Sequence, residues 1–393
     1  MEEVLTKNLT IDKTSWSLVR FGDVVIEPKE SIKDPHADGI EHVVGLEHIE
    51  PENIHLKNST SLEESTTFTK KFTVGDVLFG RRRAYLKKAA QASFSGICSG
   101  DITVFRANEK LMPQLLPFIV NNDKFFDYAV KHSAGGLSPR VKFKDLAEYE
   151  FLLPPKEQQA KLAELLWAMD ELIERELEVL VNIKQTYLSK IEKELINKEC
   201  QKTYFEDFGE IIRGVGYKPN DLLDSYSDDT CIILRSNNIF DSKINYDNIK
   251  ILNLEGVKPS QILNVGDFAV CMSNGSKELV GKSAQYIDNG KNVSIGSFCA
   301  GFRSKDILSQ RIVQHLFASE SYRYAIKRIL SGSAINNLKP SDIESLFLRI
   351  EQDKSKVGVL LNELDSFVVN MDVLESKISS SRGLQKSLIN QIF

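Results

Sequence analysis

The chain contains two copies of one sequence pattern, and this repeat constrains its fold more than any other feature. The segment "YAVKHSAGGLSPRVKFKDLAEYEFLL" (128–153) matches "YAIKRILSGSAINNLKPSDIESLFLRI" (324–350) with one inserted residue. Tyr128 and Tyr324 are 196 positions apart, and similar spacings relate "VGDVLF" to "VGDFAV" and "LLWAMDELI" to "LLNELDSFV" elsewhere in the chain. Matches that keep the same order over most of a chain indicate a tandem duplication.

The repeat predicts an α+β fold with two similar mixed α/β units and two long helices. A chain of 393 residues is too long for one ordinary core. Short β-rich runs such as "DVLFG" and "GDFAVCM" alternate with turn residues, and amphipathic helices are expected near 114–132 and 309–330. The predicted domains are residues 1–153, a helix over 154–200, residues 201–350 and a second helix over 351–393.

Both long helices have apolar residues at steps near three and four, which is the spacing of a coiled coil. In the first helix they are Leu162, Leu165 or Leu166, Met169, Leu172 or Ile173, Leu177, Leu180, Tyr187, Ile191 and Leu195. In the second they are Leu360, Leu364, Phe367, Met371, Leu374, Ile378 and, past a weak "SSSRG" stretch, Leu388. Each stripe could instead be the core face of one domain. Because the pair is duplicated, we expect the helices to pack on each other in antiparallel order, as a rigid spacer about 60 Å long.

Composition excludes several classes of protein. No apolar run approaches the roughly 20 residues that span a bilayer, and the start of the chain lacks the pattern of a signal peptide, so we expect a cytoplasmic protein. Five cysteines without a C-x-x-C pair argue against disulfide scaffolds and zinc ribbons. The spacing of His36, His42, His48 and His55 predicts no metal site. A net charge of −5 argues against nucleic acid, although local charge matters more than the sum.

Two loops of each unit have the side chains that contact DNA. Arginine and lysine neutralise phosphates, while Arg and Asn pair with base edges. The first unit supplies Arg81, Arg82, Arg83, Tyr85, Lys87, Lys88, Arg140, Lys142 and Lys144. The second unit supplies Asn274, Ser276, Lys277, Lys282, Asn336, Asn337 and Lys339. A charge run can also be ordinary solvated surface. The same loops are polar in both repeats, and this favours a role in binding in which the two units read different sequences.

The sequence contains no complete motif for catalysis. "GSKELVGKS" (275–283) resembles a phosphate-binding loop, but five residues separate its first Gly from the Gly-Lys pair, where four are required. Neither a G-x-G-x-x-G nor an amino-methyltransferase tetrapeptide is found. We therefore predict a binding protein without catalytic or metal-ligating residues.

The chain resembles the specificity (S) subunit of type I restriction–modification systems. "LLPPKEQQAKLAELLWAMDELIERE" (152–176) is similar to the family's first central helix, with Pro154, Pro155, Glu157 and Gln158 at its start. "VGLEHI", "VGDVLFGRRRAYLKKAA" and "SGDITVFRA" are also similar, as is "ILRSNNI" in the second unit, which adds Arg235 and Asn237 to the candidate DNA contacts. The second helix begins with "RIEQDKSK" and lacks the prolines.

The resemblance implies that each unit is a target-recognition domain that binds one half of a split, asymmetric DNA site. The helices would then set the unread gap and dock two methyltransferase (M) subunits, with restriction/translocase (R) subunits completing the complex. No cofactor is expected on this chain, since S-adenosylmethionine, ATP and Mg belong to the partners. Trp167, Glu171 and Arg175 are candidate partner contacts on the first helix, although Trp167 could equally be buried against the second helix.

Three alternatives stay open on the sequence. The chain could serve a related system in which modification and cleavage share one fused partner. It could be a coiled-coil adaptor between two proteins, without a role in DNA binding. A nucleotide-driven enzyme is the third, and it would hydrolyse ATP in a manner that depends on Lys282.

Overall fold

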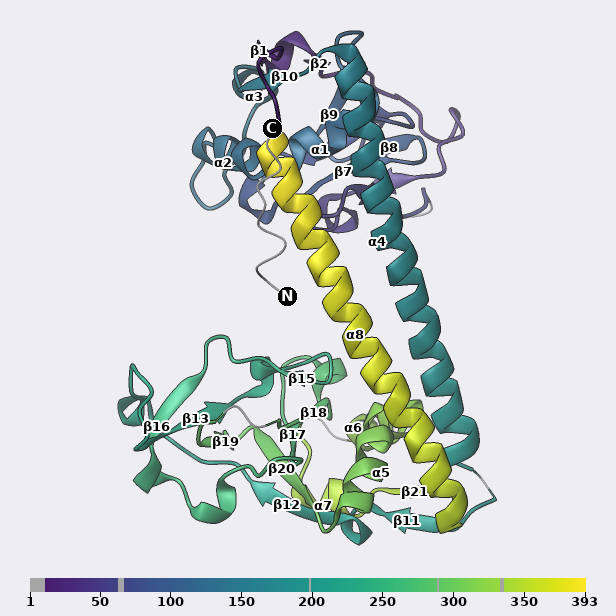
Figure 1. Ribbon diagram of the computed structural model, residues 1–393, viewed down its shortest axis with the longest axis vertical. Helices are drawn as coiled ribbons and strands as arrows, with labels where there is room; N and C mark the ends of the chain where they lie inside the picture. The colour runs from purple at the N-terminus through teal and green to yellow at the C-terminus, as the bar shows by residue number, and fades with distance from the viewer. Residues whose placement is uncertain (1–10, 63–66, 198, 288–289, 333–335) are drawn as a thin grey trace. The chain divides into compact units, whose positions relative to one another are not determined.

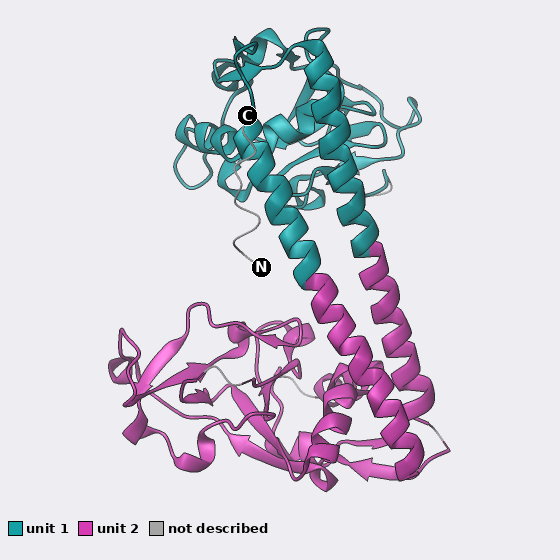
Figure 2. Ribbon diagram, viewed as in Figure 1, with its two compact units in different colours: residues 1–177, 376–393 teal, residues 178–375 magenta. Residues whose placement is uncertain are grey.

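The structure is a computed structural model that describes residues 11–62, 67–197, 199–287, 290–332 and 336–393. It divides into two compact units (Figure 2). Unit 1 contains residues 1–177 and 376–393, and unit 2 contains residues 178–375. The last segment of the chain therefore belongs to the same unit as the first.

Unit 1 is built around a five-stranded sheet of order β2-β9-β6-β7-β4 (Figure 1). Its central strand β6 (Val77–Gly80) is buried along its whole length, as expected of a short apolar run between turn residues. A three-stranded sheet β3-β8-β5 and a pair β1-β10 complete the unit. The other strands are β1 (Ser17–Arg20), β2 (Val25–Ile26), β3 (Val43–Val44), β4 (His55–Leu56), β5 (Lys70–Phe72), β7 (Ala89–Ala92), β8 (Gly96–Cys98), β9 (Ile102–Ala107) and β10 (Glu150–Leu153).

The helix predicted near 114–132 is broken into shorter pieces, so the prediction of one continuous helix was wrong. A 3-10 turn (Pro113–Leu115) leads into α1 (Leu116–Val120), and α2 (Asp123–Lys131) follows after two residues. The side chain of Asn122 accepts a hydrogen bond from the backbone N–H of Lys124 at 2.8 Å and so begins a new helix. A short α3 (Phe143–Leu146) precedes the last strand.

Unit 2 repeats this architecture. Its four-stranded sheet has the order β12-β20-β17-β18, beside a three-stranded sheet β16-β13-β19 and the pairs β11-β21 and β14-β15. The strands are β11 (Lys202–Tyr204), β12 (Gly209–Arg213), β13 (Thr230–Leu234), β14 (Ile239–Phe240), β15 (Lys243–Ile244), β16 (Lys250–Asn253), β17 (Phe268–Cys271), β18 (Ser283–Gln285), β19 (Val293–Ile295), β20 (Cys299–Ser304) and β21 (Phe347–Arg349). The helices are α5 (Ile307–Ala318), α6 (Glu320–Ser331) and α7 (Pro340–Glu344). The predicted helix 309–330 is divided at Ser319, whose hydroxyl accepts from the N–H of Tyr322.

The duplication is confirmed by matching strand pairs. β2-β9-β6-β7 corresponds to β12-β20-β17-β18, and the parallel pair β3-β8 corresponds to β13-β19. Equivalent ion pairs to a buried aspartate support both sheets: Arg106 lies 2.7 Å from Asp76, and Arg303 lies 2.6 Å from Asp267. Each aspartate is the last residue of the "VGD" that the two sequence copies share.

The long helices α4 (Lys156–Lys190) and α8 (Lys354–Ile392) each contribute to both units (Figures 1 and 2). In unit 1 the first half of α4 packs with the end of α8: Leu166 and Ile389 share one core cluster. In unit 2 the end of α4 packs with the start of α8, and Lys190 forms an ion pair with Glu363 at 2.7 Å. Because the start of α4 packs with the end of α8 in one unit, and the end of α4 with the start of α8 in the other, the two helices are antiparallel, as predicted. A π-helical turn (Ile191–Leu195) follows α4, whereas α8 continues through "SSSRG".

The predicted stripe of α4 had two ambiguous positions, and burial decides both. Leu166 and Ile173 are buried, whereas Leu165 and Leu172 are exposed. No helix in the described part of the chain is long and apolar enough to cross a membrane.

A histidine of each unit is bonded to an aspartate on one of the long helices. His55 Nε2 lies 2.6 Å from Asp170 Oδ2 in unit 1, and His315 Nε2 lies 2.9 Å from Asp365 Oδ1 in unit 2. Asp170 and Asp365 occupy the same place in the repeat, at the Asp of "LLWAMDELI" and "LLNELDSFV". The histidines come from different elements, β4 and α5. We call each His–Asp pair a histidine anchor. Its aspartate occupies the same helix position in both units, whereas its histidine comes from a different element in each.

Packing of α8 in unit 2 gives a first prediction. Leu361 is fully buried, whereas Val359 on the same helix is 61% exposed. We expect Leu361→Ala to lower the free energy of unfolding by about 2–5 kcal/mol, since it leaves a cavity. Val359→Ala should change it by less than about 0.5 kcal/mol. Urea unfolding of the two variants measures both, and equal losses would contradict this placement of α8.

The two histidine anchors predict opposite dependence on pH. The hydrogen bond that His55 donates to the carboxylate of Asp170 raises the pKa of His55 against its burial, with Glu174 and Lys57 as the other charged neighbours. A raised folded pKa contributes stability below the unfolded value near 6.5, and this is lost as pH rises through the folded pKa. Burial lowers the pKa of His315 despite Asp365, with Arg311 also adjacent, so its contribution is present above 6.5 and lost as pH falls.

Denaturant unfolding of His55→Gln and His315→Gln between about pH 5.5 and 8 tests these signs. The stability lost in His55→Gln, relative to the unsubstituted chain, should shrink as pH rises. The loss in His315→Gln should shrink as pH falls. The same slope in both variants would refute the assignment.

Candidate nucleic-acid interface

The basic loop after β6 is held in a sharp turn. Arg83 and Lys87 flank a 3-10 turn (Ala84–Leu86), and both have left-handed backbones, with φ of 55° and 49°. Such angles are costly for residues other than glycine, so neighbouring contacts must hold them. The N–H of Arg83 donates to the carbonyl of Pro139 at 2.8 Å, which ties this loop to the second predicted loop.

Arg82 and Arg140 lie in two loops that are far apart in the sequence, and the structure brings them together. They form a β-bridge, and the carboxylate of Asp101 lies between their side chains. Arg82 Nη1 lies 3.1 Å and Arg140 Nε 2.7 Å from its two oxygens. Arg82 Nε also donates to Ser138 Oγ at 2.8 Å. Burial acts to raise the pKa of Asp101, but the hydrogen bonds from Arg140 and Arg82 outweigh it and hold that pKa below its ordinary value.

Four other predicted residues of unit 1 lie around this cluster. The N–H of Arg81 donates to the carbonyl of Asp101 at 3.0 Å, and its buried Nε has no hydrogen-bond partner among the described residues. Tyr85 is 54% exposed in the turn of the basic loop. Lys142 and Lys144 are exposed at the start of α3, next to the bridge. The exposed part of the cluster is therefore basic and aromatic.

Lys87 and Lys88 point to other partners. Lys87 Nζ lies 2.7 Å from Asp123 and 3.5 Å from Glu52, and Lys386 of α8 forms ion pairs with the same two carboxylates. The hydrogen bond to Asp123 raises the pKa of Lys87 despite partial burial. Lys88 Nζ donates to the carbonyl of Leu46 at 2.7 Å. Direct DNA contact by these two lysines stays a prediction, and the structure gives both of them intramolecular partners.

Unit 2 brings its two predicted loops together in the same way. Ser273 and Asn337 form a β-bridge, and Asn336 Nδ2 donates to the carbonyl of Gly275 at 3.2 Å. Asn274 Nδ2 donates to Ser236 Oγ at 3.2 Å, and Asn274 Oδ1 accepts from the N–H of Ser276 at 3.0 Å. Residues 333–335 of the second loop lie outside the described part of the chain.

The turn that contains Arg235 and Asn237 joins this cluster through Ser236. Arg235 precedes a 3-10 turn (Ser236–Asn238), and its Nη2 donates to the carbonyl of Asn248 at 2.8 Å. Asn237 and Lys277 are exposed. Lys282 and Lys339 lie at the loop ends: the carbonyl of Lys282 accepts from Cys271, and the N–H of Lys339 donates to Asp342.

Sequence reasoning missed the residue at the centre of each cluster. In unit 1 it is Asp101, and in unit 2 the same place in the repeat holds Phe298. The carbonyls of Asp101 and Phe298 accept equivalent backbone hydrogen bonds, both at 3.0 Å, from Arg81 and Met272. The signal was available in the alignment of "SGDITVF" with "GSFCAGF", which puts the two residues at one position.

The predicted partner contacts on α4 behave differently from one another. Glu171 and Arg175 are exposed and form an ion pair of 2.5 Å along the helix. Trp167 donates from Nε1 to the carbonyl of Gln114 and packs edge-on against Phe118, at 5.3 Å between ring centres. It is half-buried against the globular part of its own unit. Partner binding by the three residues stays a prediction.

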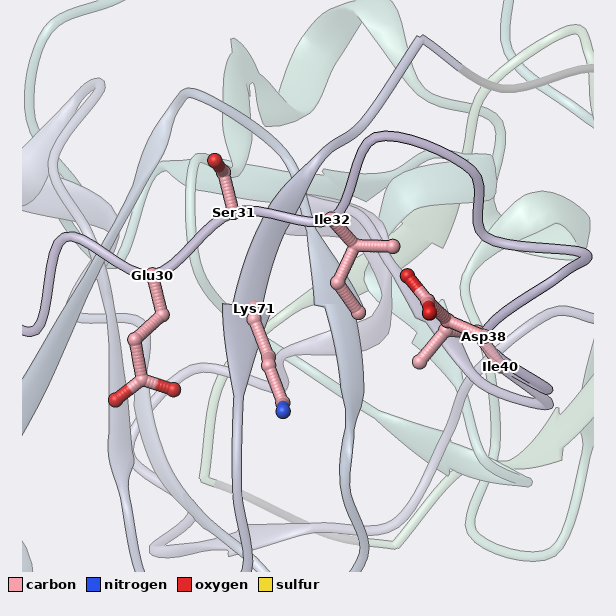
Figure 3. A pocket seen from close by; sticks show the side chains of 6 residues that line it. All are labelled: Glu30, Ser31, Ile32, Asp38, Ile40 and Lys71. Atoms are coloured by element: carbon pink, nitrogen blue, oxygen red, sulfur yellow. The ribbon is translucent and has the colours of Figure 1, made fainter.

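A hollow of about 450 Å³ on unit 1 contains none of the predicted DNA contacts. Glu30, Ser31, Ile32, Asp38, Ile40 and Lys71 line it (Figure 3). Two carboxylates line the hollow, those of Glu30 and Asp38, and Glu30 is already neutralised by an ion pair with Arg106 at 2.8 Å. Among the described residues, no group of three or more His, Cys, Asp or Glu side chains is arranged to hold a metal ion.

Comparison with known proteins gives one family over the first part of the chain. Residues 15–185 match the family described as type I restriction modification DNA specificity domain. The chain is 31% identical over 169 residues to the type I restriction enzyme StySPI specificity subunit of Salmonella potsdam, and 29% identical over 168 residues to the EcoKI specificity subunit of Escherichia coli (strain K12). These matches cover 43% and 42% of this chain, and only 36% of the length of each relative.

A solved structure matches the whole fold. The S subunit of a type I restriction-modification system from M. genitalium superposes with a TM-score of 0.54 over 99% of this chain and 98% of that chain. Their sequence identity is 13%, so the likeness concerns the fold alone.

Proposed function

Because residues 15–185 carry a type I restriction modification DNA specificity domain, we propose that the chain is the sequence-reading subunit of a restriction–modification complex. Each unit would bind one half of a bipartite, asymmetric DNA site. The observation that carries the proposal is the pair of equivalent loop clusters, bridged at Arg82–Arg140 and at Ser273–Asn337. The same backbone frame presents different side chains in the two units, as two readers of different sequences require.

The helices supply the second part of the proposal. Segments of α4 and α8 belong to the cores of both units, and the helix pair would set the gap between the half-sites. Methyltransferase subunits would dock on exposed helix residues such as Glu171 and Arg175, and restriction/translocase subunits would complete the complex. S-adenosylmethionine, ATP and Mg would be bound by those partners. We propose no catalytic residue in this chain.

Methylation profiling of the host genome, with and without this gene, tests the proposal. We expect a split motif whose methylation requires the chain. Arg83→Ala should weaken methylation that depends on one half of the motif, and Lys277→Ala the other, because the two exposed residues belong to different units. Lys33→Ala, an exposed lysine outside both clusters, is the control. A non-DNA adaptor predicts unchanged methylation in all strains, and equal loss at both halves would contradict modular reading.

The helices give a prediction of their own. Seven residues inserted after Lys184 in α4, together with seven after Asp372 in α8, keep the apolar faces in register. Each helix grows by about 10 Å, so the unread gap should lengthen by about three base pairs while the letters of both half-sites stay the same. The insertion in α4 alone is the mismatched control. Methylation that stays at the original spacing in a strain with the double insertion would refute the spacer role.

A further inference from the structure

Asp101 is an unusual residue to find at the centre of a basic loop cluster. The side chains around it come from two loops, one after β6 and one before α3, and both donate to its carboxylate. Hydrogen bonds to Asp101 and Ser138 use Nε and Nη1 of Arg82 and Nε of Arg140. A guanidinium has five N–H donors, so each arginine has donors beyond these. The two side chains are 38% and 44% exposed, which leaves their ends accessible to a ligand.

Each arginine donates one N–H to the carboxylate, and Arg82 donates a second to Ser138, which restricts the direction of the remaining donors. Arginine then presents a rigid fork, and the acceptors that fit such a fork in the major groove are O6 and N7 of guanine. Phosphate binding is the other use of arginine, but it gains nothing from Asp101. The carboxylate would repel a phosphate and cancel part of the positive charge that attracts it. The arrangement therefore favours base reading.

Unit 2 shows that the fold does not need these three side chains. Ser273 and Asn337 form the equivalent bridge, and Phe298, 69% exposed, occupies the place of Asp101. The backbone hydrogen bond to this position is kept at the same length. Since the loops of unit 2 close without a carboxylate or an arginine at these positions, the loop frame does not by itself require the ion cluster of unit 1.

We propose that Arg82 and Arg140 read guanine in the half-site bound by unit 1, with Asp101 as their positioning residue. This inference rests on the proposed function. Among the described residues of unit 2, Ser273 and Asn337 stand in the places of Arg82 and Arg140, so unit 2 would read its half-site by other contacts, from Asn274, Asn337 and the exposed ring of Phe298.

The test is the methylated motif in a host that carries the complete system with variants of this chain. Variants of unit 2, Lys277→Ala and Asn337→Ala, identify the half-site that they leave unchanged, which belongs to unit 1. That half should contain guanine. Arg140→Lys, which keeps the charge but loses the fork, and Asp101→Asn should each lower discrimination for guanine there by about 5- to 150-fold, the value of one bidentate contact. Discrimination at the other half should not change.

Two results would overturn the inference. One is a unit 1 half-site without guanine on either strand. The other is a uniform loss of methylation in Arg140→Lys, with the letters of the motif intact, as a phosphate contact or a purely structural role predicts. Thermal unfolding of each variant separates misfolding from a loss of guanine discrimination. If Asp101→Asn fails to fold, Arg82→Lys, which keeps the ion pair, replaces it. Absence of any split motif in the unsubstituted system would instead refute the proposed function.

Discussion

The structure depends on the packing of both long helices into the core of each unit. In unit 1, Leu166 of α4 and Ile392 of α8 lie in one cluster with the phenylalanines of the sheet and of α2. In unit 2, Tyr187 precedes the end of α4 and joins Leu361 and Leu364 of α8 in the corresponding cluster. Neither globular part has a closed core without these helix segments. The helices are consequently structural parts of both domains, and a change in their pairing is felt by the sheets that carry the loops.

Much of this fold was predictable from the sequence, because duplication makes a weak pattern appear twice. The order of elements and the antiparallel pairing followed from it. Local choices did not: a step of three or four admits both Leu165 and Leu166, and only the surface that covers the helix selects one of them. The break at Asn122 was missed because apolar spacing continues on both sides of it, while the cap depends on one side-chain hydrogen bond. The spacing of apolar residues indicates which face of a helix is buried, but it does not indicate a single hydrogen bond that ends one helix and begins another.

The candidate site was predictable as a set of loops and not as an arrangement. Arg82 and Arg140 were both identified by charge, but nothing in their spacing placed them on either side of one carboxylate. Lys87 belongs to the same charge run, and the structure pairs it with Asp123 and Glu52. A run of like charges in a tight turn sends its side chains in different directions, so membership of the run does not predict contact with one ligand. A search for positive charge does not find an acidic residue, so the carboxylate of Asp101 between Arg82 and Arg140 was missed.

The way in which the loops are held explains how two copies of one fold can acquire different ligands. Backbone hydrogen bonds close them: Arg81 to Asp101 in unit 1 and Met272 to Phe298 in unit 2, with a β-bridge beside each. Backbone N–H and C=O groups form these hydrogen bonds whichever side chains the residues have, so substitution at these positions leaves the loop backbone in place. The ion pairs made by the buried aspartates, Arg106 with Asp76 and Arg303 with Asp267, occur in both copies and have not diverged. The residues that hold the sheet and the side chains that the loops expose are thus different, although they lie within a few positions of each other, and the exposed ones can change while the sheet keeps its ion pairs.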